Sequence, residues 1–185
     1  SVWLNPKDIE LYARTHTSVA HCPKSNLKLA SGIADTDAYL KAGINVSIGT
    51  DGTASNNTLD MVEETRFAAL LPKGTRYNPE AVSARTALRM ATINGARALG
   101  LGHLTGSLET GKRADLIVIH ADASNMIPVY DEYSAIVYAA NSKNIRSSMV
   151  NGKWIMRNRE VLNIDKEATM HAMQHLVNES RKCNQ

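Results

Sequence analysis

The 185-residue sequence has few of the residues that hold small proteins together by disulfides or aromatic packing. It contains two cysteines, Cys22 and Cys183, which lie far apart in the chain. Such a pair forms neither a disulfide framework nor a zinc ribbon, and it is typical of a reduced, cytoplasmic protein. With one Phe and two Trp, most of the core must consist of aliphatic side chains and Ala.

Long apolar runs and blocks of like charge are also missing. No stretch reaches the roughly eighteen apolar residues of a membrane span, so we expect no membrane partner. The basic residues are scattered and the net charge is only +3, which argues against a nucleic-acid partner. The opening SVWLNPKDIE has neither an initiator Met nor the pattern of a signal peptide. The remaining composition, 43% apolar and 21% charged, is that of an ordinary globular protein.

Short apolar runs alternate with helical patterns over the first hundred residues. Strands are predicted at 18–21 and 44–49. Strands that alternate with helices indicate parallel βα units and therefore an α/β fold. The helices are predicted at 5–16, at 35–42, at 59–71 with Asn57 or Thr58 as cap, and at 80–101 after the loop PKGTRYNP.

The pattern changes after about residue 104. A strand is predicted at 116–119, and 134–140 fits either a strand or a short helix. Asn151-Gly152 stands between two alternating apolar runs, which is a strong hairpin signal. A final helix is predicted at 165–182, capped by Asp165.

Two polar side chains follow the predicted strands of the first half. In the stretch NVSIGTDGTASNN, the apolar alternating run stops at Asp51, and His21 ends the strand before it. Functional groups in parallel βα folds gather at the carboxyl ends of strands, where a carboxylate can bind a divalent metal or accept a proton. The alternatives are an Asx turn at Asp51 and a packing role for His21. Ser25 and Asn26 are further polar candidates in the loop after His21.

Other histidines carry little information about function. His171 and His175 stand four residues apart on the predicted final helix, which is a metal-binding spacing. No glutamate of an H-E-x-x-H motif lies between them, and we interpret the pair as a coincidence on a surface helix. The sequence has no G-x-S-x-G motif, no Walker loop and no G-x-G-x-x-G motif.

Several stretches, read together, resemble the amidohydrolase superfamily. Within it, they are most similar to the methylthioadenosine/S-adenosylhomocysteine deaminases and the related chlorotriazine hydrolases. The resemblance runs in order from about residue 1 to about residue 160. The stretches are VAHCPKSNLKLASGIA, GINVSIGTDGTASNNTLDMVEETRFAALL, and ALRMATINGARALGL followed by GSLETGKRADLIVI.

The resemblance implies the C-terminal portion of a metal-dependent (β/α)8 barrel and part of a small β-sandwich. By this match, residues 1–104 hold the last two barrel strands with their helices, 105–164 belong to the sandwich, and 165–185 form the C-terminal helix. Asp51 corresponds to the eighth-strand aspartate, which binds zinc or iron and takes the proton of the attacking water. His21 and Ser55 match positions near the substrate, a purine- or triazine-like heterocycle.

The sequence also departs from the family pattern. The family's H-x-H pair of metal ligands occurs nowhere in it. One carboxylate is too few to hold a catalytic zinc, so we expect a fragment of a longer enzyme that is inactive alone. The open strand edges predict self-association or a complementing N-terminal chain. The alternatives to deamination are a chlorotriazine-type dechlorination and a non-catalytic truncated chain.

Overall fold

The computed structural model describes residues 1–183 and has the mixed α/β content that the sequence predicts. Asn5 caps the first helix by accepting from the backbone of Lys7 and Asp8, and the Asp8 carboxylate accepts from the Asn5 backbone in return. The predicted helices at 5–16 and 35–42 and strands at 18–21 and 44–49 are confirmed with slightly shorter bounds. The elements are α1 (Pro6–Arg14), β1 (Val19–His21), α2 (Pro23–Lys28), α3 (Thr36–Lys41) and β2 (Val46–Ile48).

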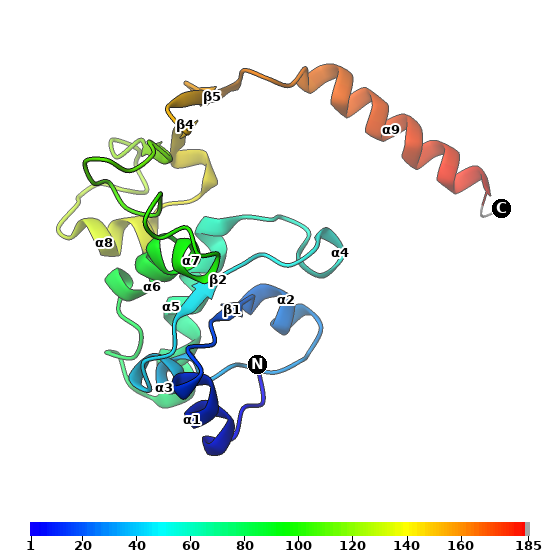
Figure 1. The fold of residues 1–185 in the computed structure, drawn as a ribbon. Helices are drawn as coiled ribbons and strands as arrows, with labels where there is room; N and C mark the ends of the chain where they lie inside the picture. The colour runs from blue at the N-terminus through cyan, green and yellow to red at the C-terminus, as the bar shows by residue number, and fades with distance from the viewer. Residues whose placement is uncertain (184–185) are drawn as a thin grey trace.

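Strands β1 and β2 pair in parallel, with Val19 opposite Val46 and His21 opposite Ile48. The carboxyl ends of the two strands therefore lie at the same edge of this small sheet. Helix α2 follows β1, and the short helix α4 (Thr53–Asn56) follows β2. Both helices lie on the same side of the molecule in Figure 1. Helix α2 was not predicted, because the residues after His21 were interpreted as a loop.

The predicted helix at 59–71 is longer and begins later than expected. Helix α5 (Met61–Arg76) is capped by Asp60, whose side chain accepts from the backbone of Val62 and Glu63. The prediction of Asn57 or Thr58 as cap was therefore wrong. The helix also continues through Pro72 into the expected loop, because Pro72 is buried against the core and packing outweighs its low helix propensity.

The single helix predicted at 80–101 is in fact two helices. Ser83 caps α6 (Ala84–Met90) by accepting from the backbone of Thr86. Thr92 then leaves the helical region, with φ −127° and ψ −99°, before α7 (Ile93–Ala98) begins. Ala81 and Val82 are buried but lie ahead of the first helix. The apolar pattern was continuous, so it did not reveal the break.

The second half of the chain forms an antiparallel sheet in the order β3–β4–β5–β6. The predicted strand at 116–119 is confirmed, and 134–140 is helical. Asn151 and Gly152 have positive φ values of 49° and 77° between β4 and β5, which confirms the predicted hairpin. The elements are β3 (Leu116–Ile119), α8 (Glu132–Ser134), the π-helix η1 (Ala135–Ala139), the 3-10 helix η2 (Ser142–Asn144), β4 (Ile145–Val150), β5 (Lys153–Arg157) and β6 (Glu160–Val161).

The core lies between the parallel strands and helices α3, α5 and α6. Tyr39, Val46, Ala68, Ala87 and Met90 are fully buried in it. Small and aliphatic side chains predominate in this cluster, as the scarcity of Phe and Trp predicts.

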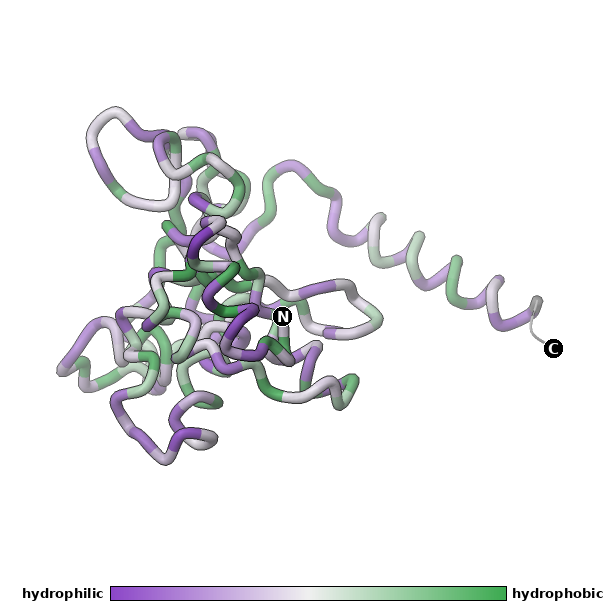
Figure 2. The backbone as a smooth tube through the Cα atoms, turned by 60° about the horizontal axis from the view of Figure 1, so that its bottom comes forward, coloured by the Kyte–Doolittle hydropathy of each residue, from purple (hydrophilic) through white to green (hydrophobic). Residues whose placement is uncertain are grey.

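The last helix, α9 (Lys166–Cys183), extends away from the rest of the chain (Figure 1). Its predicted cap is confirmed, since the Asp165 carboxylate accepts from the Ala168 backbone at 2.9 Å. Hydrophobic and hydrophilic residues alternate along this helix in Figure 2, and residues 166–182 are all exposed. Within the described residues, no helix combines the length and the apolar character needed to cross a membrane.

Candidate functional site

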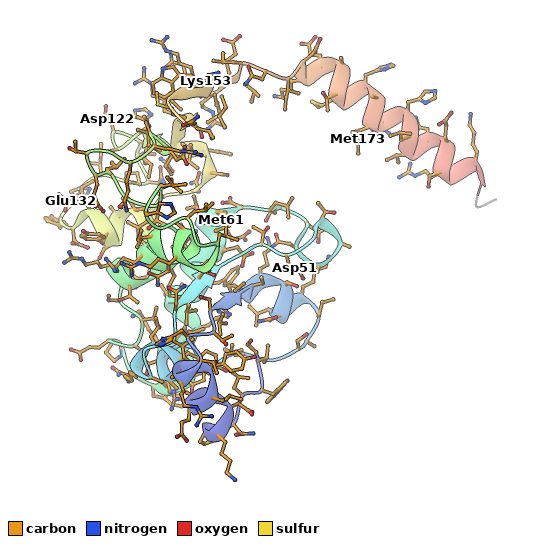
Figure 3. The ribbon with its side chains drawn as sticks, in the orientation of Figure 1. Asp51, Met61, Asp122, Glu132, Lys153 and Met173 are labelled. Atoms are coloured by element: carbon orange, nitrogen blue, oxygen red, sulfur yellow. The ribbon has the colours of Figure 1, made fainter. Side chains whose placement is uncertain are left out.

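The candidate site lies at the carboxyl ends of the two parallel strands. Asp51 stands three residues beyond the end of β2, and Ser25 lies in α2, directly after β1. Figure 3 shows Asp51 beside α2, in the segment that leads from β2 to α4. The parallel pairing therefore brings together two loops that are 26 residues apart in the sequence.

Two serine hydroxyls hold one oxygen of the Asp51 carboxylate. Ser25 Oγ donates to Oδ2 at 2.7 Å, and Ser55 Oγ donates to the same atom at 2.8 Å. Among the described residues, no side chain donates to Oδ1. The bonds from Ser25 and Ser55, followed by one from the Gly52 backbone, lower the pKa of Asp51 below its usual value. The carboxylate is therefore ionised at neutral pH, and its Oδ1 accepts from no side chain among the described residues.

The backbone of Asp51 has a left-handed conformation, with φ 61°. Non-glycine residues adopt this region uncommonly, although Asp and Asn tolerate it better than most. Such strain persists only where surrounding contacts impose it, and it is concentrated at functional sites. Here the serine bonds to the side chain and the helix α4 immediately after it supply those contacts.

His21 is buried at the end of β1, with 3% of its surface exposed. Burial lowers the pKa of His21 to about 4, so its imidazole is neutral at physiological pH. Within the described residues, no hydrogen bond joins its side chain to Asp51. The structure thus places His21 on the adjacent strand, whereas it brings Ser55 into direct contact with Asp51.

The sequence did not identify three residues of this neighbourhood as part of the site. Ser25 was only a loop candidate, although it contacts Asp51 as closely as Ser55 does. Asn56 and Glu64 are both fully buried and hydrogen-bonded to each other beneath the site. A polar residue inside the apolar face of a helix was the available signal for Glu64. The hydrogen bond between Glu64 and Lys24 could not be predicted from the sequence, because the two residues are 40 positions apart.

The chemistry of Asp51 fits a divalent metal, but as one ligand of a larger set. A carboxylate oxygen is a suitable ligand for zinc and for harder divalent ions. Residues 1–183 contain no cluster of three His, Cys, Asp or Glu side chains that could complete a site by themselves. His171 and His175 do not form one on α9, where His175 Nδ1 instead lies 3.6 Å from Glu179.

Comparison with known proteins identifies the family to which this chain belongs. Residues 1–155 match the model of the Amidohydrolase family. The chain belongs to the amidohydrolase family. It is 51% identical over 166 residues to the 5-methylthioadenosine/S-adenosylhomocysteine deaminase of Moorella thermoacetica, a match that covers 90% of this chain and 39% of that protein. The chain thus spans about two fifths of that relative's length.

Two solved structures of similar fold extend the comparison. An adenosine deaminase from Xanthomonas campestris, crystallised with bound zinc, superposes with a TM-score of 0.96 at 40% identity. That match covers 98% of this chain and 41% of the other. The atrazine chlorohydrolase TrzN of Arthrobacter aurescens, complexed with zinc, superposes with a TM-score of 0.89 at 30% identity. That match covers 96% of this chain and 40% of the other. The resemblance to amidohydrolases drawn from the sequence is confirmed.

Proposed function

We propose that these residues are the C-terminal part of a metal-dependent amidohydrolase that deaminates an adenosine-like ring. In this assignment β1 and β2 are two strands of a (β/α)8 barrel within residues 1–104. Residues 105–164 contribute to a β-sandwich, and the predicted C-terminal helix at 165–185 corresponds to α9, with residues 184–185 outside the described part of the chain. The parallel pairing of β1 and β2, with helices between and after them, supports this assignment.

The observation that carries the proposal is the ionised Asp51 carboxylate at the carboxyl end of β2. Its Oδ2 is occupied by two serine hydroxyls, which leaves Oδ1 for a divalent metal, either zinc or iron, and for a proton. When bound, the metal would activate a water molecule by lowering the pKa of that water. Asp51 would help to hold this metal, and as an ionised carboxylate it would be placed to take up a proton from the attacking water and to give it to the departing amine.

We assign His21 and Ser55 to the substrate side of the site. The Ser55 hydroxyl proton is directed to Asp51 Oδ2, with the Gly52 carbonyl oxygen as a second acceptor at 3.1 Å. The oxygen lone pairs of Ser55 are left as acceptors for an N–H group of a heterocycle. His21 is neutral, so it can offer one donor and one acceptor without adding charge. A small heterocyclic substrate is the only partner class that this assignment requires besides the rest of the enzyme.

We propose that the remaining metal ligands come from a longer chain or from a complementing N-terminal chain, and that the 185 residues alone do not turn over. A two-stranded sheet of three residues per strand supports this, because sheets this small are marginal without further strands. Self-association through the same edges is the competing arrangement. The two distant cysteines support a cytoplasmic location.

The test measures ammonia release by a longer protein that contains these residues. The probes are 5-methylthioadenosine, S-adenosylhomocysteine and adenosine, and a chlorotriazine with chloride release tests the alternative reaction. We expect ammonia release, and a loss of at least about 100-fold in kcat for Asp51→Asn, since general acid–base groups contribute about 10²–10⁴-fold.

The matched control is Asp122→Asn, because the Asp122 side chain is 89% exposed and distant in sequence from the site. It should retain the wild-type rate. Retention of more than about a tenth of the rate in Asp51→Asn would contradict the role given to Asp51. Release of chloride without ammonia would favour the chlorotriazine reaction instead.

A further inference from the structure

Glu64 is a buried acid without a role in the chemistry described above. It lies in the first turn of α5 and has none of its surface exposed. Burial of a carboxylate is costly unless hydrogen bonds compensate it. Burial raises the pKa of Glu64, and hydrogen bonds from Lys24 and Asn56 oppose that effect. The contacts that hold this side chain therefore indicate its purpose.

The two carboxylate oxygens of Glu64 contact two different loops. Oε2 accepts from the backbone N–H of Lys24 at 3.2 Å, and Oε1 accepts from Nδ2 of Asn56 at 2.5 Å. Lys24 directly precedes Ser25, and Asn56 directly follows Ser55. Glu64 therefore binds the chain immediately beside each serine that donates to Asp51.

Asn56 extends this connection to Asp51 itself. Its Nδ2 also donates to the backbone oxygen of Thr50 at 2.7 Å, on the residue before Asp51. Its Oδ1 accepts from the Leu59 backbone at 3.0 Å, which fixes the far end of the loop. The left-handed backbone of Asp51 is thus held from Thr50 through Asn56 to Glu64.

We propose that Glu64 is a positioning residue that sets the geometry of the Asp51 carboxylate by joining the loops after β1 and β2. The inference rests on the proposed function, since Asp51 is the group whose geometry matters. An apolar side chain at position 64 would fill the space but leave the Lys24 N–H and one N–H of the Asn56 amide without an acceptor, while the bond from Asn56 to Thr50 would remain. A carboxylate accepts from both at once because it carries two acceptor oxygens.

The experiment compares Glu64→Gln with wild type in the 185-residue chain. A glutamine has the same shape but only one acceptor oxygen, so its NH₂ group must face either the Lys24 N–H or the Asn56 NH₂. The matched control is Glu10→Gln, because Glu10 is exposed on α1 and its side chain forms no hydrogen bond or ion pair among residues 1–183.

Two readouts separate positioning from a general loss of stability. The first is hydrogen exchange at the amides of Ser55, Asn56 and Asn57, which are hydrogen-bonded within the loop. We expect exchange there to rise about tenfold or more relative to amides of the β4–β5 hairpin, from the loss of a bond to a charged group. The second is the HN–Hα coupling and Cα shift of Asp51, which report its left-handed φ and should change.

A change at Asp51 in Glu64→Gln and none in Glu10→Gln supports the proposal. A uniform rise in exchange over the whole chain, with the Asp51 coupling unchanged, would overturn it. If Glu64→Gln does not fold, Asn56→Ala removes the same link from the other side and should give the same two changes. If neither variant folds, Glu64 and Asn56 are required for folding of the whole chain rather than for positioning Asp51, and the proposal is overturned.

These measurements need no metal, so they remain informative if the proposed function fails. A positive result together with wild-type turnover in Asp51→Asn would retain the link between Glu64 and Asp51 while refuting the role of Asp51 in deamination. Wild-type behaviour of Glu64→Gln together with an inactive Asp51→Asn would refute the link between Glu64 and Asp51 while retaining the role of Asp51 in deamination.

Discussion

At the scale of single residues, the buried imidazole of His21 makes stability depend on pH. The unfolded chain binds a proton at His21 below pH 6.5, whereas burial keeps the folded chain from doing so until about pH 4. The contribution of His21 to stability is therefore fully present above pH 6.5 and is lost as the pH drops from 6.5 toward 4. We expect protonation of His21 in the unfolded chain to lower the free energy of unfolding by about 2 kcal/mol between pH 7 and pH 4.5.

Urea denaturation at the two pH values measures this contribution. His21→Gln removes the titrating group, so the loss of stability on acidification should be smaller by about 2 kcal/mol. The comparison uses the difference between two pH values, so any constant effect of the substitution cancels. An equal loss in the variant and in wild type would show that His21 is not neutral and buried in the folded state.

At the scale of elements, Lys73 connects the last turn of α5 to the segment before α6. Its Nζ donates to the carbonyl oxygens of Pro79, Ala81 and Val82, at 2.8, 2.7 and 3.2 Å. These bonds fix a segment that has no regular structure of its own. We expect Lys73→Met to lower the free energy of unfolding by about 2 kcal/mol, because the three carbonyls lose a charged donor.

The control is Lys7→Met on the first turn of α1, where the side chain is exposed. Thermal or urea unfolding should show a change within about 0.5 kcal/mol for this variant. If Lys73→Met is as stable as the control, water replaces the lysine at these carbonyls and the segment does not depend on it.

The same elements show which features could be predicted from the sequence. The cap at Asp165 and the Asn151-Gly152 hairpin depend on neighbouring residues, so local rules predicted both. The continuation of α5 through Pro72 depends on burial against distant segments, and no local rule contains that information. Asp51 was predicted because it ends a strand. The contact of Ser25 with Asp51 and that of Glu64 with Lys24 were not predicted, since these partners lie 26 and 40 residues apart.

At the scale of the whole molecule, α9 stands apart from the rest of the described chain. Residues 166–182 are all exposed, and Figure 1 shows the helix extending away from the other elements. Its apolar side chains Met170, Met173 and Leu176 therefore contribute no burial to the fold of this chain. Removal of residues 165–185 should change the free energy of unfolding by less than about 0.5 kcal/mol.

Denaturant unfolding of the shortened chain, at several protein concentrations, checks this expectation. A concentration-independent curve identical to that of the full chain is the predicted result. A loss of more than about 1 kcal/mol would mean that α9 packs against the body or against a second copy.

In the proposed function, Asp51 is one metal ligand of a larger site, and the other ligands are proposed to come from outside these residues. The 185-residue chain should therefore hold much less than one metal ion, because a catalytic zinc requires about three protein ligands. A longer protein that contains these residues should hold about one.

The most direct measurement is equilibrium zinc binding to the longer protein, comparing wild type, Asp51→Asn and the exposed control Asp122→Asn by dialysis and elemental analysis. We expect Asp51→Asn to weaken zinc binding by at least about tenfold, because the neutral amide is a poor ligand, whereas Asp122→Asn should bind zinc as wild type does. Equal zinc affinity in Asp51→Asn and wild type would show that Asp51 is not a metal ligand and would overturn the proposed site.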